Sequence, residues 1–214
     1  NGLEEDQSWD AQVFVMPDGE DAVLEWAANV SATTELLIEM PLGSVDDSSD
    51  ISRSFTVVGL DTYTDGMREV NLIEGALPDS SQPTTQVMMD EGAMIFLQWD
   101  IGDTQVVSIN GAETPVEIVG ITRGEISRTM YFIRGELTEI TGINATSVYL
   151  VIPEGVEIDT QLGEISAGIV ERQTLIDGIE SLIEQQTQIF QAIMYLGLLF
   201  TIAVMLNTMI MNVA

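Results

Sequence analysis

Hydrophobic positions near the start of the chain alternate with polar ones and then change to helical spacing. Residues 9–16 read WDAQVFVM, an apolar run with partial alternation that predicts a strand. Turn residues follow at 17–19, and apolar residues at helical spacing over 20–29 predict a helix. Residues 33–42, TTELLIEMPL, predict a second strand. The pattern therefore indicates a β-α-β unit.

The middle of the chain consists of short β-rich segments. It begins after a polar, acidic stretch at 43–52 that predicts a loop. Strands are expected at 55–60, 85–89, 104–109 and 116–121, and short helices at 94–99 and 135–141. Asn110-Gly111 predicts a hairpin between the last two strands. We interpret this region as a small mixed β-rich subdomain.

A second β-α-β pattern follows the middle region. Residues 147–152, SVYLVI, predict a strand that Pro153 ends. Asp159 is expected to cap a helix that Gly168 ends, and residues 169–173 alternate as a short strand. This order of elements repeats that of the first unit, which suggests that the two units pair in one α/β subdomain.

We predict an α+β fold in which the two units pair as a split ferredoxin-like α/β sandwich. This porter-like subdomain comprises residues 1–52 and 142–173, and residues 53–141 form the inserted β-rich subdomain. A stalk helix at 174–188 then continues into one transmembrane helix at 189–214.

Apolar residues recur at three- and four-residue steps beyond position 174. Residues 174–177, TLID, fit the capping-box pattern at the start of this stripe. The candidate stalk and coupling positions are Thr174, Leu175, Ile176, Ile179, Leu182 and Ile183. We expect one continuous helix of about 40 residues from here to the C-terminus. The alternative is a pair of helices with a bend at 185–188.

The last thirty positions lack charge altogether. No Asp, Glu, Lys or Arg occurs in residues 185–214. About 20 helical residues cross the ~30 Å hydrocarbon core of a bilayer, so residues 189–214 predict a transmembrane helix. Candidate packing positions in it are Phe190, Ile193 and Asn207. Asn207 is expected to face another transmembrane helix or the cytoplasmic interface, and the alternative is that Asn212 marks the edge of the membrane.

Composition excludes several classes of function. The chain has 35 acidic and 6 basic residues and a net charge of −29, so it repels nucleic acid. It has neither cysteine nor histidine, which excludes thiolate metal sites, cysteine nucleophiles and the Ser-His-Asp triad. The acidity itself has two interpretations. It is either an adaptation to high salt or a surface that binds or steers cations.

The scarcity of basic residues also predicts orientation. Arg172 is the nearest basic residue before the predicted span, whereas a cytoplasmic flank normally carries several. Residues 1 to about 185 are therefore expected outside the cytoplasm. The sequons at 29–31 and 144–146 agree with this location. Because the chain opens at Asn1 without a signal peptide, we expect it to be part of a longer polypeptide.

No segment predicts a catalytic, metal or cofactor site. Residues 61–66, DTYTDG, have a passing likeness to a calcium loop, but Tyr63 and Leu72 stand where ligands are needed, so a turn is expected. The acidic run at 46–50 is interpreted as a solvated loop. No nucleotide-binding glycine motif is present. We do not expect an enzyme.

Several segments resemble the MacB/FtsX-type permeases of ABC transporters. Residues 70–78, VNLIEGALP, are similar to a family segment with leucine, glycine and proline at the same spacing. Residues 86–103 resemble a segment that ends in Gly-Asp, and 116–121 a valine-rich strand that ends in Val-Gly-Ile. The final stretch from Leu206, LNTMIMNVA, resembles the second transmembrane helix of the family.

The resemblance implies a specific function, whereas the amino-acid composition alone does not. It implies a permease segment in the cell membrane that transmits ATP-driven helix motion to an exterior domain, for export or for signalling. It also implies partners: a separate cytoplasmic ABC ATPase that hydrolyses ATP, other transmembrane helices of the same or a second permease, and membrane lipid. The alternative is the ectodomain and membrane helix of a signalling receptor.

Overall fold

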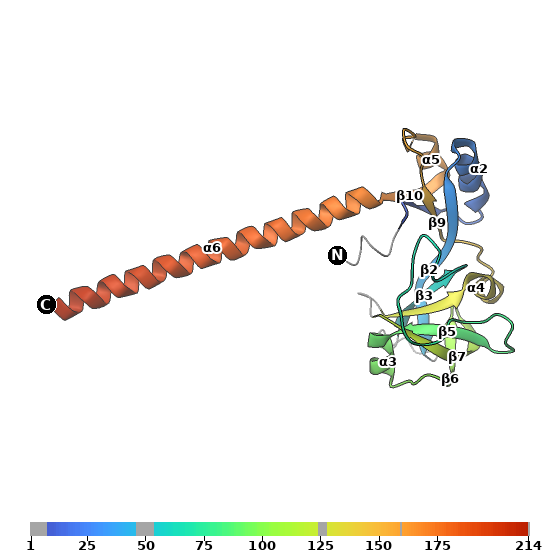
Figure 1. The fold of residues 1–214 in the computed structure, drawn as a ribbon, viewed down its shortest axis with the longest axis horizontal. Coiled ribbons are helices and arrows are strands. Elements are labelled where there is room, and N and C mark those ends of the chain that lie inside the picture. The colour runs from blue at the N-terminus through green and yellow to red at the C-terminus, as the bar shows by residue number, and fades with distance from the viewer. Residues whose placement is uncertain (1–7, 46–53, 124–127, 159, 214) are drawn as a thin grey trace. The chain divides into compact units, whose positions relative to one another are not determined.

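The computed structural model describes residues 8–45, 54–123, 128–158 and 160–213. The chain divides into two units, Asn1–Val170 and Glu171–Ala214, which are considered separately. The mixed α/β character predicted from the sequence is confirmed in the first unit (Figure 1). Of the loop predicted at 43–52, residues 43–45 instead form the end of β2 (Thr33–Val45), where they pair with β3 (Ser54–Leu60) and β6 (Thr104–Ile109). The rest of it, including the acidic run at 46–50, and the cap Asp159 lie outside the described residues.

The first unit is built on one β-sheet. Within the described residues ten strands form it, in the order β10-β1-β9-β2-β3-β8-β5-β7-β4, with β6 beside β2 and β7. The strands are β1 (Ala11–Val15), β2 (Thr33–Val45), β3 (Ser54–Leu60), β4 (Leu72–Gly75), β5 (Thr85–Asp90), β6 (Thr104–Ile109), β7 (Ala112–Thr122), β8 (Thr129–Ile133), β9 (Ser147–Val151) and β10 (Ser166–Glu171). The helices of this unit are α2 (Glu20–Val30), α3 (Glu91–Leu97), α4 (Arg134–Thr141) and α5 (Thr160–Ile165).

The first part of the sheet comprises β10, β1, β9 and the beginning of β2. Its elements follow the chain order β-α-β and β-α-β that the sequence indicates. Helices α2 and α5 lie side by side against it (Figure 1). Alternate residues of β1 and β9 face these helices. Their core is Val13, Val23, Trp26, Ala27, Val148, Leu150 and Leu162, and its burial is the main force that holds this part together.

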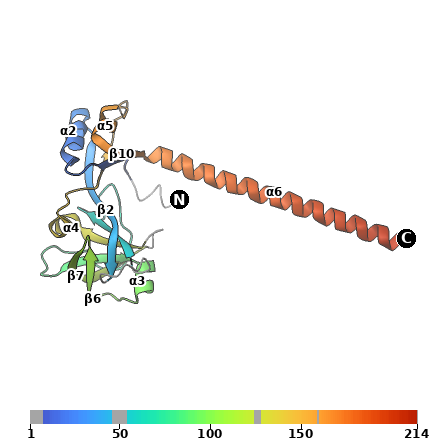
Figure 2. The same ribbon diagram turned by 180° about the vertical axis from the view of Figure 1, so that it is seen from behind.

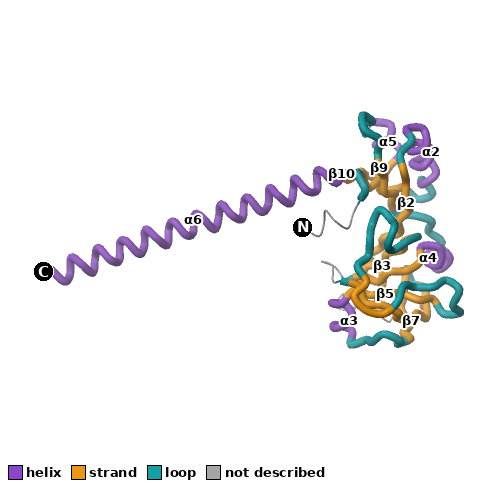
Figure 3. Tube along the Cα trace, in the orientation of Figure 1, coloured by secondary structure: helices purple, strands orange, loops and turns teal. Residues whose placement is uncertain are grey.

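The second part contains the remaining strands with α3 and α4. Strand β2 belongs to both parts: residues 33–37 pair with β9, and residues 38–44 pair with β3. Figure 3 shows this strand passing from one part to the other, and Figure 2 shows the same arrangement from behind. A further apolar cluster lies where the parts meet. It joins Trp9, which stacks on Tyr149 at 5.1 Å, with Leu60 and Tyr131 of the second part.

Several predicted elements need correction. The helix expected to end at Gly168 ends at Ile165, because residues 166–171 instead form β10 beside β1. The helix expected at 94–99 is α3, which begins at Glu91 because Asp90 caps it. The prediction missed β4 and β8. The Asn110-Gly111 hairpin is confirmed, with Ile109 paired to Ala112 and both turn residues at positive φ.

The second unit is one helix, α6 (Arg172–Val213), of 42 residues. It runs without interruption, so the alternative of a bend at 185–188 is wrong. It begins at Arg172, and Thr174 therefore lies inside its first turn and does not cap it, contrary to the capping-box prediction. Within the described residues, no helix combines the length and apolar character that a membrane crossing requires. The transmembrane helix at 189–214 stays a prediction.

Candidate functional site

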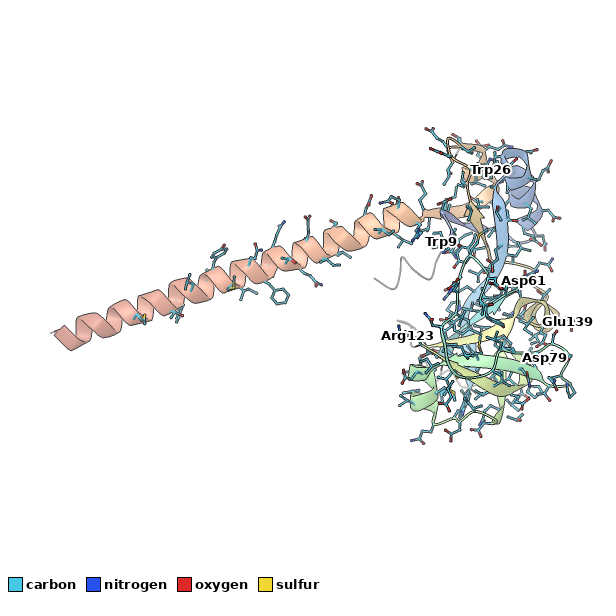
Figure 4. All side chains as sticks on the ribbon, viewed as in Figure 1. Trp9, Trp26, Asp61, Asp79, Arg123 and Glu139 are labelled. Atoms are coloured by element: carbon cyan, nitrogen blue, oxygen red, sulfur yellow. The ribbon has the colours of Figure 1, made fainter. Side chains whose placement is uncertain are left out.

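The predicted stalk and packing residues all lie on α6. Many of its described apolar side chains are exposed (Figure 4). Leu182, Phe190 and Ile193 are 62%, 70% and 59% exposed. Leu175 and Ile183 are exposed as well, and so is Thr174, whereas Ile176 is half-buried. Ile179 and Asn207 lie on the same helix. The coupling and packing roles of these residues stay predictions.

The structure brings the three segments of the family resemblance together around β7. Strand β7 contains residues 116–121. Strand β5, from the segment 86–103, pairs with it in parallel, and β4, from the segment 70–78, pairs with it antiparallel. Segments that are far apart in the sequence therefore form one continuous piece of sheet. In these segments Asp90, Gly102 and Gly75 each occupy a position at which the structure favours that amino acid.

The first is Asp90, which joins β5, α3 and β8. It is 2% exposed, and its extended backbone makes it the N-cap of α3. Its Oδ1 accepts a hydrogen bond from the backbone N–H of Ala93 at 3.1 Å. Its Oδ2 accepts one from the backbone N–H of Thr129 at 2.5 Å. Both carboxylate oxygens thus satisfy buried N–H groups, one at a helix end and one at a strand start.

The second is Gly102 of the Gly-Asp pair, which forms the turn into β6. Its φ of +93° is a conformation that favours glycine. The N–H of Gly102 donates to the carbonyl oxygen of Ile118 at 2.8 Å, and the N–H of Ile118 donates to the carbonyl oxygen of Asp103 at 3.0 Å. The Asp103 carboxylate accepts from the N–H of Asp100 at 2.9 Å. The pair therefore attaches β6 to β7 and has a structural role.

The third is Gly75 in β4, which lies opposite Gly120 of β7. Gly75 has a φ of +90°. A Cβ atom on it would lie 2.2 Å from the carbonyl oxygen of Val119, and a Cβ on Gly120 would lie 2.6 Å from that of Ala76. The two backbones therefore approach more closely than residues with side chains permit.

Residues 71–77, which we call the β4 edge, form the end of the sheet at this place. Every residue of the β4 edge is exposed. Its apolar members include Leu72, Ile73 and Leu77, at 38%, 54% and 39% exposure. Ile101 is 38% exposed and its Cδ1 lies close to Gly75. An exposed edge strand with this many apolar side chains is uncommon in a soluble domain surface.

A polar network joins the two parts of the sheet-bearing unit. The Nε of Arg134 donates to both carboxylate oxygens of Asp61 at 2.9 Å, and its Nη1 donates to the carbonyl oxygen of Asn144 at 2.9 Å. The amide of Asn144 donates to Glu20 of α2 at 3.0 Å. Asp61 therefore binds an arginine, and Asp65 donates its N–H to Thr62, as in a turn. These contacts agree with the rejection of a calcium loop at 61–66.

Among the described residues, no group of three or more Asp and Glu side chains is arranged to hold a metal ion. The absence of a cofactor stays an expectation. Asp79 is instead part of a turn, in which it accepts hydrogen bonds from Ser81 and Gln82. The hydrogen bonds from Ser81, followed by that from Gln82, lower the pKa of the Asp79 carboxyl.

Glu35 of β2 holds the loop that follows β3. Its Oε2 accepts a hydrogen bond from the backbone N–H of Met67, and the N–H of Ser8 donates to the carbonyl oxygen of Met67 at 3.0 Å. The Oε1 of Glu35 is buried with no hydrogen-bond partner among the described residues. Burial raises the pKa of the Glu35 carboxyl, and the negative charge of Asp61 raises it further, against the lowering effect of the Met67 hydrogen bond.

This raised pKa predicts that Glu35→Gln flattens the dependence of stability on pH. A carboxyl whose pKa rises on folding stabilises the folded state fully below its ordinary value of 4.5 and loses that effect as the pH rises through the folded value. The glutamine keeps an acceptor for Met67 and removes the buried charge. Thermal unfolding between about pH 4.5 and pH 7.5 should therefore show a smaller loss of stability in Glu35→Gln than in the wild type.

The control for this experiment is Glu91→Gln, which removes one negative charge from an exposed position. Burial also raises the pKa of Glu136, but Glu136 is present in all three proteins and cancels from the comparison. If Glu35→Gln and Glu91→Gln change the pH profile equally, the effect belongs to net charge and the assignment to Glu35 is wrong.

Comparison with known proteins adds structural neighbours. No family model matches the chain, and no curated protein sequence matches it. The extracellular domain of the noncanonic ABC-type transporter YknZ from Gram-positive bacteria is 12% identical with a TM-score of 0.47, and the match covers 74% of this chain and 88% of that one. The periplasmic region of MacB from Actinobacillus actinomycetemcomitans is 15% identical with a TM-score of 0.42, over 84% of this chain and 80% of that one.

These neighbours are extracytoplasmic domains of ABC-type transporters. A permease-protein domain from Porphyromonas gingivalis is also similar, at 15% identity and a TM-score of 0.40, over 72% of this chain and 70% of that one. The sequence resemblance named the same kind of permease. Because the identities are at most 15% and the TM-scores lie below 0.5, we draw no functional conclusion from these likenesses.

Proposed function

We propose that the chain is the extracytoplasmic domain and following transmembrane helix of an ABC transporter permease of the MacB/FtsX type. In this proposal residues 174–188 of α6 form a stalk and residues 189–214 cross the membrane. ATP hydrolysis occurs on a separate cytoplasmic subunit, and the helix transmits the resulting motion to the exterior domain, for export or for signalling.

The observation that carries this proposal is the direct continuity between β10 and α6. Strand β10 ends at Glu171 and α6 begins at Arg172, so no loop separates them. Helix α6 has 42 residues, or about 63 Å at 1.5 Å per residue, of which a bilayer core uses ~30 Å. Strand β10 is hydrogen-bonded to β1. In this proposal a displacement of the helix acts on the chain at the end of a strand of the sheet.

Sequence supports the same proposal. The charge-free stretch at 185–214 is long enough to cross a bilayer with some tilt. The motif-bearing segments that resemble the permease family form one contiguous piece of sheet around β7. No observation in the described residues favours the alternative of a signalling receptor.

Cysteine labelling tests the predicted topology. Residues 1–214 contain no cysteine, so each substitution introduces a single cysteine into this part of the polypeptide, and any cysteine elsewhere in the full-length polypeptide is first replaced by serine. In intact cells that express the full-length polypeptide, a membrane-impermeant maleimide should label Thr104→Cys and Glu184→Cys. It should leave Leu198→Cys unlabelled until the membrane is solubilised, because this position lies in the predicted span. Labelling of Leu198→Cys in intact cells at the rate of Glu184→Cys would exclude the span.

The same full-length protein tests the predicted partner. After mild solubilisation, an ABC ATPase should copurify with it and remain bound when the Thr104→Cys label is present. Copurification of a kinase or a response-regulator system in place of an ATPase would favour the receptor alternative.

A further inference from the structure

Strand β4 (Leu72–Gly75), within the β4 edge, pairs with another strand of the described residues on one side only. Strand β4 pairs with β7 on one side and is the last strand of the sheet order, so within the described residues no strand lies on its other side. All its residues are exposed, including Leu72 and Ile73. The N–H of Arg123 donates to the carbonyl oxygen of Asn71 at one end of the segment, and Asp79 lies two residues beyond Leu77 at the other. Figure 4 labels Arg123 and Asp79.

Natural proteins usually protect such edges. Short length, charge, proline and bulges all discourage pairing with another chain. The β4 edge has some of this protection in Glu74 and in the bulge between Leu72 and Glu74. It still presents Ile73 at 54% and Leu77 at 39% exposure. The β4 edge is thus partly protected against pairing with arbitrary strands, yet it keeps apolar side chains in solvent. This combination is expected of an edge strand that binds a particular partner.

Charge decides which occupant fits. Residues 69–79 contain Glu69, Glu74 and Asp79 and no basic residue, and the whole chain carries a net charge of −29. Two arginines lie at the Asn71 end: Arg68, which pairs with Glu39 at 3.5 Å, and Arg123, so the acidic part of the segment is the part from Glu74 to Asp79. A second copy of the chain would bring two strongly negative molecules together, with Glu74 near its own counterpart, and like charges on paired strands are destabilising. An extended segment with lysine or arginine would instead meet opposite charge.

We propose that the β4 edge binds an extended, basic segment of a partner protein as an added strand. Backbone hydrogen bonds to the free side of β4 would supply affinity. Apolar side chains at alternate positions of the partner would pack on Ile73 and Leu77, and its basic residues would lie near Glu74. Because β4 is short, the contact area is small and the interaction is transient. This surface lies on the sheet and does not depend on the topology proposed above for α6.

A model peptide tests the proposal. The probe is a fluorescently labelled peptide of about ten alternating lysine and valine residues. Its binding to the purified full chain in detergent is followed by anisotropy at about 0.15 M ionic strength. Substitution Ile73→Asp should weaken binding at least about tenfold, although it adds a charge that attracts the peptide. A second variant, Leu77→Asp, should act in the same direction.

Two controls separate strand pairing from charge attraction. Val106 on β6 is also apolar and also 54% exposed, so Val106→Asp adds the same charge elsewhere on the sheet and should leave the affinity within about twofold. A peptide that is N-methylated at alternate residues has the same charge and slightly more apolar surface but cannot pair along one edge, and it should bind at least about tenfold more weakly.

Each contrary outcome overturns the proposal. Equal effects of Ile73→Asp and Val106→Asp, or equal binding of the methylated peptide, would mean that net charge alone attracts the probe. No binding to the wild-type chain would mean that the edge is not available to a basic strand. A dimer in sedimentation that Ile73→Asp dissociates would assign the edge to a second copy. A failed labelling result for α6 would leave the peptide experiment unaffected.

Discussion

Asp90→Ala is expected to lower the free energy of unfolding by about 3 kcal/mol. The substitution removes the N-cap of α3, which costs about 1 kcal/mol, and leaves the buried N–H of Thr129 without its carboxylate acceptor, which costs about 2 kcal/mol. For a chain of 214 residues this corresponds to a fall of about 6–12 °C in the thermal midpoint, measured by circular dichroism.

Graded variants separate the two roles of Asp90. Asp90→Ser keeps a cap for α3 and loses the bond to Thr129, so it should fall between the wild type and Asp90→Ala. Asp90→Asn keeps one acceptor oxygen and turns an NH₂ group toward one of the two N–H groups, so it should also destabilise. The matched control is Glu91→Ala on the exposed first turn, expected within about 0.5 kcal/mol of the wild type. An Asp90→Ala midpoint equal to that of Glu91→Ala would contradict this account.

Elements with a regular pattern of burial could be predicted from the sequence. Val23, Trp26 and Ala27 share one buried face of α2, which the helical spacing indicated. Strand β1 buries Ala11 and Val13 and leaves Phe14 exposed, in agreement with the partial alternation of residues 9–16. The Asn110-Gly111 hairpin follows from local backbone preference alone. In each case neighbouring residues contain the whole signal.

Strand β8 shows why other elements were missed. It lies between β3 and β5 and is buried on both faces, so residues 129–132 show no alternation. The signal that remained was the apolar run Met-Tyr-Phe-Ile between Arg128 and Arg134. Strand β4 has the opposite character, since all its residues are exposed. Neither full burial nor full exposure produces the period-2 pattern on which strand prediction depends.

Contacts across long sequence separations were also beyond prediction. Arg134 and Asp61 are 73 positions apart, and Asn144 and Glu20 are 124 positions apart. Their pairing depends on the sheet order, which no single sequence specifies. The sequence resemblance did identify the segments around β7. It did not explain why they contain particular glycine and aspartate residues, because that reason depends on the pairing of β4, β5 and β7.

The two ends of the sheet order have different connections. At one end β10 continues directly into α6, and at the other end β4 has a free side among the described residues. If both proposals are correct, motion enters the domain through one edge strand and a partner binds at the other. The strands between them pack through cores to which β2 contributes in both cases.

Gly75→Ala is expected to separate β4 from β7 and to destabilise the domain by about 3 kcal/mol. A methyl group at this position meets the carbonyl oxygen of Val119 at 2.2 Å, so the strand must move. The movement breaks the hydrogen bond from the N–H of Ala76 to Val119, which is 2.9 Å long, and adds backbone strain at a φ of +90°. Hydrogen exchange of the Ala76 amide should accelerate together with a lower thermal midpoint.

Gly102→Ala provides the control that separates strain from steric overlap. Gly102 has a φ of +93°, almost that of Gly75, but apart from its two chain neighbours no heavy atom of the described residues lies within 4 Å of the position that its Cβ would occupy. Its substitution therefore introduces the backbone strain alone, about 1 kcal/mol. Gly75→Ala should exceed it by about 2 kcal/mol, and only Gly75→Ala should expose the Ala76 amide. Equal losses in the two variants would mean that the conformation of Gly75, and not the close approach of β4 to β7, accounts for the glycine at this position.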